Sequence, residues 1–216
     1  MRRPFVLLIV VLILVLLLIY WTLRSSIWNY DQVPMVLHNA YPFLTFDRIR
    51  QYLDANVNIR AQPKDNNTIA DRSSVKLDPK NHAFLYDLIE TNAFGLRNAR
   101  VSRKVPVEYR IYKKGSSGMK WHTDFRVLPP EVKYYEVTLT ISNDSDCRFE
   151  YITSPDSFKQ LPGAHVAFNT SRNQEIRSVQ TAANTAILLP PGEIRHRATE
   201  LTYGERLFLK FIVVYD

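Results

Sequence analysis

The chain has 216 residues, a formal net charge of +7 and a single cysteine, Cys147. One cysteine excludes an intrachain disulfide, so a folded domain must be stable through its buried core alone. Arg2, Arg3 and Arg24 flank one apolar segment, which leaves the remainder only mildly basic. This charge lacks the clustered basic stripe of nucleic-acid-binding proteins and argues against a nucleic-acid partner.

Residues 5–23 are a continuous apolar stretch without a charged side chain. A helix of this length reaches roughly 28 Å, which is close to the hydrocarbon thickness of a bilayer. A cleaved signal peptide is the alternative, but its apolar part is usually shorter and is followed by small residues. We therefore expect a transmembrane signal anchor at residues 1–24, with Arg2 and Arg3 favouring a cytoplasmic N-terminus.

The remainder of the chain would then lie in the lumen of the endoplasmic reticulum, the Golgi or an equivalent compartment. Asn66, Asn143 and Asn169 each begin an N-x-S/T sequon, which suits a lumenal domain. Residues 25–43 show no sustained period and are expected to be a stalk or lead-in, followed by a single domain at 44–216.

The first part of this domain has helical periodicity. The apolar spacing predicts a helix over residues 45–55, with Thr45 as its N-cap, and a second helix over residues 81–93. The polar stretch 61–80 between them is typical of a long loop.

After residue 100 the apolar period changes to two, which is typical of half-buried strands. Strands are predicted at 106–113, 119–126, 134–142, 147–153, 164–169, 175–180, 185–190, 194–199 and 205–215. Helices followed by a run of short strands favour the α+β class. We expect the helices to support a double-stranded β-helix, or jelly roll, because closure removes most exposed strand edges.

One predicted strand holds the first candidate site residues. In the stretch MKWHTDF, His122 and Asp124 are two residues apart and would point to the same face of a strand. They could hydrogen-bond each other, or they could be two ligands of a metal. His196, in a late strand, could supply a third ligand, since two histidines and one carboxylate leave open positions on a non-haem iron. Alone, His196 could equally be a surface residue, and His165 is the alternative distal histidine.

Arg206 follows His196 by ten residues, after a short turn at 201–204. This spacing is expected to return the chain antiparallel beside His196, with the guanidinium deeper in the barrel. Arginine binds carboxylates bidentately, so Arg206 could grip the far end of a dicarboxylate held at the metal. The alternative is a solvated charge at the rim. Position 175, which stands at the same distance from His165, is a glutamate and could not serve in this way.

The stretches YRIYKKGSSGMKWHTDF and AILLPPGEIRHRATELTYGERLFLKF resemble the two ends of an iron(II)/2-oxoglutarate-dependent dioxygenase domain. The likeness is greatest to the prolyl 4-hydroxylase alpha-subunit-like members and covers about residues 100–216. It implies Fe(II) held by His122, Asp124 and His196, with O2 as oxidant and ascorbate as reductant.

The same resemblance implies that Arg206 binds the distal carboxylate of 2-oxoglutarate. A family tyrosine that touches this co-substrate matches Tyr112, with Tyr109 in reserve. The prolyl hydroxylases usually carry lysine where Arg206 stands, a difference that bears on the substrate more than on the chemistry.

The implied activity is hydroxylation of a C–H bond, most simply on a prolyl or lysyl side chain of a protein or peptide. The alternative from another class is a catalytically inactive jelly-roll binding module tethered to the membrane. A zinc hydrolase would lack an obvious general base and would leave Arg206 unexplained. Nucleic-acid demethylation suits neither the anchor nor the modest charge.

Overall fold

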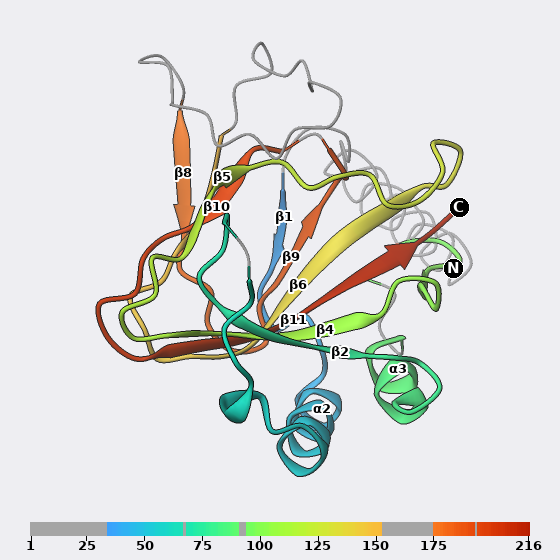
Figure 1. Cartoon of the computed structure of the whole chain (residues 1–216). Coiled ribbons are helices and arrows are strands. Elements are labelled where there is room, and N and C mark those ends of the chain that lie inside the picture. Colours follow the sequence, from blue (N-terminus) through green and yellow to red (C-terminus); the bar gives the residue numbers. More distant parts are fainter. Residues whose placement is uncertain (1–33, 67, 91–93, 153–174, 193) are drawn as a thin grey trace, which may run out of the picture. The chain divides into compact units, whose positions relative to one another are not determined.

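The computed structural model describes residues 34–66, 68–90, 94–152, 175–192 and 194–216. Within these ranges two α-helices precede most of the strands, which form two antiparallel sheets (Figure 1). The predicted anchor at 5–23 and the predicted strand at 164–169 lie outside the described residues. Among the described residues, none of the helices has the length and apolar character needed to cross a membrane.

The larger sheet has seven strands in the order β1-β9-β6-β11-β4-β2, with β3 paired to β11. Its strands are β1 (Met35–Leu37), β2 (Ser73–Leu77), β3 (Arg100–Val101), β4 (Val107–Lys113), β6 (Tyr134–Asn143), β9 (Ala186–Leu189) and β11 (Glu205–Val214). The smaller sheet has the order β5-β10-β7-β8. It consists of β5 (Met119–His122), β7 (Phe149–Ile152), β8 (Ile176–Val179) and β10 (His196–Ala198). The chain passes repeatedly between two antiparallel sheets, as the predicted jelly roll requires.

The helices cover the outer side of the larger sheet (Figure 1). They are α2 (Phe43–Asn56) and α3 (Ala83–Glu90), and a short 3-10 turn, η1 (Ile59–Ala61), follows α2. The Tyr86 hydroxyl of α3 donates to the Leu77 carbonyl of β2 at 2.9 Å and accepts from the Val107 amide of β4 at 2.8 Å. These buried bonds fix α3 against the sheet, so the helices act as the predicted support.

The start of α2 differs from the prediction. The helix begins at Phe43, with Pro42 at the N-cap position and no side-chain cap, so Thr45 is not the cap. Proline fits a helix start because the first amides have no intrahelical acceptor in any case. Phe46, Ile49 and Leu53 are buried, so the predicted apolar stripe is confirmed.

Besides the two-residue β3, which pairs with β11, two strands were not predicted. β2 lies within the stretch 61–80 that was expected to be a long loop, and it pairs along its whole length with β4. β1 lies inside the expected lead-in at 25–43 and pairs with β9. Both strands are short and stand at the ends of the sheet order, where one partner strand and not their own apolar pattern holds them.

The expected pairing of the last two strands is also wrong. β10 pairs with β5 and β7 in the smaller sheet, whereas β11 pairs with β3, β4 and β6 in the larger one. The turn at 201–204 therefore carries the chain from one sheet to the other. As a result Arg206 approaches the His196 strand from the opposite sheet.

Gly118 allows β5 to lie close to the end of β10. Its φ is +73°, and a Cβ atom built there would stand 2.3 Å from the Thr199 carbonyl oxygen. Any side chain would push the backbone segments apart, so this position needs glycine.

Candidate metal centre

His122 and His196 face each other across the β5–β10 pair. The two residues are direct partners in the antiparallel register, and their ring centroids are 4.3 Å apart. Directly opposed residues project from the same face of a sheet, so the pairing itself brings the two imidazoles together. The sequence predicted both residues, and the register explains why they meet.

Backbone carbonyls fix both rings. Nδ1 of His122 lies 2.8 Å from the Lys120 carbonyl oxygen, and Nδ1 of His196 lies 3.0 Å from that of Ile194. Each Nδ1–H therefore donates to the backbone, which leaves the Nε2 lone pairs directed at Asp124. Within the described residues, the buried Nε2 of His122 has no hydrogen-bond partner. An acceptor atom buried in this way is what a metal ligand requires.

Asp124 completes the cluster, although it does not lie in a strand. β5 ends at His122, and Asp124 stands in the irregular segment that follows, so the expectation of a shared strand face is wrong for this residue. Its two carboxylate oxygens lie 3.5 Å from the Nε2 atoms of His122 and His196, respectively. One ligand atom from each residue lies within 4.8 Å of the others. Two imidazoles and one carboxylate fit Fe(II) and leave coordination positions open.

The protonation states also suit metal binding. Burial lowers the pKa of His196 to about 3, and the neighbouring His122 adds to the fall. Burial alone would raise the pKa of Asp124, but Lys210 and the two histidines outweigh it and hold the pKa well below its usual range. Neutral imidazole and ionised carboxylate are the forms that bind a metal.

Arg206 lines the same cavity as the three candidate ligands. It is 2% exposed, so the alternative of a solvated rim charge is wrong. Its Nη1 lies 3.8 Å from the Cys147 sulfur and its guanidinium lies over the Phe208 ring. Within the described residues, its Nε and Nη2 have no hydrogen-bond partner and no carboxylate pairs with it. A buried cation in this condition can bind an anion that enters the cavity.

Tyr112 is the cross-strand partner of Arg206 and lines the cavity with it. Its ring stacks on that of Phe208, with 5.6 Å between the ring centroids, and its hydroxyl oxygen lies 3.5 Å from the Met119 sulfur. Tyr109 stands three residues earlier on β4, so its side chain projects from the other face of the sheet, and it does not line this cavity. Of the two tyrosines, Tyr112 is therefore the one beside Arg206.

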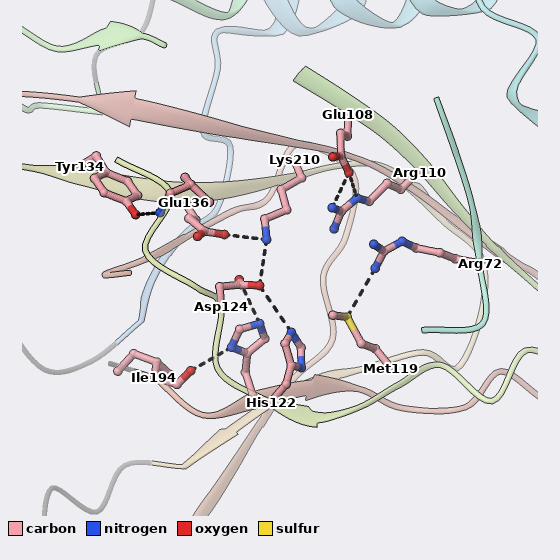
Figure 2. A network of polar contacts seen from close by, with 12 residues as sticks. Arg72, Glu108, Arg110, Met119, His122, Asp124, Tyr134, Glu136, Ile194 and Lys210 are labelled. Atoms are coloured by element: carbon pink, nitrogen blue, oxygen red, sulfur yellow. Dashed lines mark hydrogen bonds and ion pairs between the residues drawn. The ribbon is translucent and has the colours of Figure 1, made fainter. Parts of the chain in front are cut away.

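Two charged residues at the cluster were not predicted. Lys210 on β11 lies 3.0 Å from Asp124 and 2.6 Å from Glu136 on β6 (Figure 2). Burial raises the pKa of Glu136 to about 8, with Asp124 adding to the rise and Lys210 opposing it. A lone acid in the apolar strand YYEVTLTI, and a lysine on the same strand face as Arg206, were the sequence signals for them.

The remaining candidate, His165, lies outside the described residues. Of the predicted site residues, the structure brings together His122, Asp124, His196, Arg206 and Tyr112.

Comparisons with known proteins locate this arrangement among solved structures. Neither a protein-family model nor a curated protein sequence matches the chain. A prolyl-4-hydroxylase from Pseudomonas putida is similar in structure, with a TM-score of 0.55 at 12% identity, over 88% of this chain and 96% of that one. HygX from Streptomyces hygroscopicus, solved with nickel, 2-oxoglutarate and hygromycin B bound, has a TM-score of 0.58 at 13% identity, covering 89% and 87% of the two chains. The alpha-ketoglutarate-dependent carbocyclase SnoK, from nogalamycin biosynthesis, has a TM-score of 0.67 at 11% identity, covering 89% and 83%.

These likenesses establish the fold. The chain has the jelly-roll fold of the iron(II)/2-oxoglutarate dioxygenase superfamily, including its prolyl hydroxylase members, so the predicted resemblance is confirmed at this level. The HygX structure contains nickel and 2-oxoglutarate, and this chain has a His-Asp-His cluster that could hold a metal ion.

Proposed function

We propose that the protein is an iron(II)/2-oxoglutarate-dependent dioxygenase that hydroxylates a substrate C–H bond. The observation that carries the proposal is the buried Arg206 guanidinium, which has no acidic partner in the described residues and faces the cavity of the His-Asp-His cluster. A metal site alone does not call for such a cation. A co-substrate that binds the metal at one end and carries a second carboxylate at the other does.

Each residue of the site has a distinct task. His122, Asp124 and His196 would hold Fe(II), with both rings kept in orientation by backbone carbonyls. Fe(II) and 2-oxoglutarate, when bound, supply the chemistry in which O2 converts the keto acid to succinate and carbon dioxide and one oxygen atom enters the substrate.

The chain also protects this chemistry. Around Arg206, an apolar cluster keeps water away from the co-substrate end of the cavity and consists of Tyr112, Cys147, Ala198, Leu201 and Phe208. Water exclusion strengthens the pairing of a carboxylate with Arg206 and limits side reactions.

For the substrate we propose a peptidyl side chain, prolyl first and lysyl second. The fold that this chain shares with a prolyl-4-hydroxylase over most of both lengths supports this choice. HygX and SnoK have the same fold, so the fold alone does not fix the substrate.

The test is turnover by the full-length protein. It is incubated with Fe(II), ascorbate and labelled 2-oxoglutarate, with and without a library of prolyl- and lysyl-containing peptides. Peptide-stimulated succinate release, together with a gain of one oxygen atom in a peptide, is expected. Asp124→Ala is the matched inactive control. Metal binding without succinate release, under every condition, would favour a tethered binding module over an enzyme.

We further propose that residues 5–23 anchor the protein in a membrane and that residues from 34 onward lie in the lumen. The sequons support an ordered test. Asn66 is exposed, whereas the Asn143 amide donates to the carbonyl oxygens of Cys147 and Thr181 at 3.3 and 3.0 Å. Of these two sites, a glycosidase-sensitive mobility shift should therefore depend on Asn66 and not on Asn143; Asn169 lies outside the described residues. Protease attack on the domain in sealed microsomes would contradict this topology.

A further inference from the structure

Asp124, Lys210 and Glu136 form a row of charges at one end of the candidate metal centre (Figure 2). The Lys210 ammonium lies between the two carboxylates, 3.0 Å from Oδ1 of Asp124 and 2.6 Å from Oε2 of Glu136. Lys210 comes from β11 and Glu136 from β6, so two strands of the larger sheet bring these charges to Asp124, which lies in the irregular segment after β5. Glu136 is 3% exposed, so its carboxyl group is buried in the core beside Lys210.

Lys210 alone would be an obstacle to metal binding. Its ammonium occupies a carboxylate oxygen of Asp124, and a divalent ion bound to that carboxylate would stand close to a second positive charge. Like charges at such distances repel strongly in the weakly screening interior of a protein. A lysine in this position therefore both competes for a ligand and opposes the ion.

Glu136 offers the ammonium a second place. The Lys210–Glu136 contact is already the shorter of the two, and in the described part of the chain no other cation pairs with Glu136. When a metal takes Asp124, Lys210 can remain in contact with Glu136, without a change of strand or a large movement of its side chain.

We propose that Glu136 is a positioning residue for the metal centre, which acts by holding the Lys210 ammonium so that Asp124 is free to bind the ion. The inference rests on the metal site of the proposed function. It goes beyond it by giving Glu136 and Lys210 a joint role in metal affinity. The simpler alternative is that the pair only stabilises the core, in which case metal affinity should not depend on Glu136.

The experiment is a titration of the metal-free, full-length protein with Mn(II), without 2-oxoglutarate. Binding is measured by calorimetry and by the electron paramagnetic resonance signal of free Mn(II). The variants are Glu136→Gln, Lys210→Met and the double variant. Glu108→Gln is the matched control, because Glu108 lines a neighbouring cavity with Glu136 but pairs with Arg110 and not with Lys210.

Glu136→Gln should lower Mn(II) affinity about 10- to 100-fold, the range typical of groups that support a metal ligand. The double variant should recover to within about threefold of the wild type, because removal of the ammonium removes the competitor. Glu108→Gln should stay within about threefold as well. Recovery in the double variant is the result that a purely structural role for Glu136 does not produce.

Three results would overturn the inference. They are unchanged affinity in Glu136→Gln, a double variant as weak as that single variant, and an equal loss in Glu108→Gln. Thermal unfolding of each variant shows whether it is folded. If Glu136→Gln does not fold, Glu136→Asp replaces it, since a shortened carboxylate should weaken the hold on Lys210 and lower the affinity in the same direction. If the wild type itself binds no Mn(II), or binds it equally after His122→Ala, the metal site falls and this inference with it.

Discussion

Arg206 and Lys210 are two cations on the same face of one strand, four residues apart, but their surroundings differ. Arg206 is 2% exposed and has no carboxylate partner in the described residues, whereas Lys210 contacts two carboxylates. Within the described residues, Lys210 therefore has acidic partners and Arg206 has none, so Arg206 can pair with an anionic ligand. Under the proposed function, the distal carboxylate of the co-substrate would bind at Arg206, because Lys210 already contacts two carboxyl groups.

The candidate metal centre, which lines the same cavity as the two cations, can be removed by substitution. His122→Ala, Asp124→Ala or His196→Ala should abolish Fe(II) binding and turnover, because each residue supplies one of three protein ligands. The measurement is anaerobic Fe(II) binding, with circular dichroism to confirm that the fold remains. Retention of iron and activity in His196→Ala, with loss of both in His165→Ala, would show that the distal ligand has been assigned to the wrong histidine.

The Arg206 side of the comparison predicts a large effect on the co-substrate and little effect on the metal. Truncation of one partner in a desolvated arginine–carboxylate pair typically costs about 2–5 kcal/mol, or roughly 30- to 5,000-fold in affinity. Arg206→Ala should weaken 2-oxoglutarate binding within this range, and Arg206→Lys should be milder because it keeps the charge but loses the bidentate geometry. Anaerobic titration of 2-oxoglutarate at saturating Fe(II) measures both. Equal affinities in wild type and Arg206→Ala would remove the co-substrate anchor.

Substitution of Tyr112, which lies beside Arg206, should have a smaller effect on 2-oxoglutarate affinity than substitution of Arg206. Tyr112→Phe removes only the hydroxyl beside the Arg206 end of the cavity, and loss of one hydrogen bond is worth about 0.5–1.5 kcal/mol. We expect 2-oxoglutarate affinity to fall by roughly 2- to 13-fold. Tyr109→Phe is the matched control on the same strand and should leave this affinity unchanged. The same titration distinguishes the two, and an effect confined to Tyr109 would reverse the assignment.

The smallest expected effect concerns Glu108 and Arg110, an ion pair next to Lys210. Burial would raise the pKa of Glu108, but Arg110 outweighs it, so the pKa in the folded protein lies below the ordinary value of 4.5. A carboxyl of this kind stabilises the fold above that pH, and the contribution is lost as the pH falls through the pKa of the folded state. Glu108→Gln should therefore be less stable than wild type at pH 7, by up to about 1 kcal/mol. Urea unfolding at pH 7 and in acid measures this, and the difference should shrink in acid.

The sequence predicted those features that depend on local pattern. The period of two located most described strands, and the spacing of His122, Asp124 and His196 indicated a metal site. The sheet partners of β10 and β11 were predicted wrongly, because strand order depends on contacts between distant segments and a four-residue turn can join strands of one sheet or of two. β2 was missed for a related reason, since a polar strand at a sheet edge is held by its partner and carries little signal of its own.

Lys210 and Glu136 could not be connected from the sequence. They are 74 positions apart and lie on neighbouring strands, and each alone is an ordinary charged residue in an apolar strand. The β6–β11 register brings them near each other, with Glu136 opposite Ile212 and Lys210 opposite Thr138. The burial of Arg206 is a similar case, because the sequence allowed both a rim charge and a ligand anchor.

The opposed positions of His122 and His196 have a mechanical consequence. β5 and β10 share a short ladder with a register shift, so few backbone bonds hold them together at this point. An ion bound by both imidazoles would cross-link the two strands. Loading of the site should then slow amide hydrogen exchange along β5 and β10 more than along the longer β6–β11 pair, and the mouth of the barrel would stiffen as the centre fills.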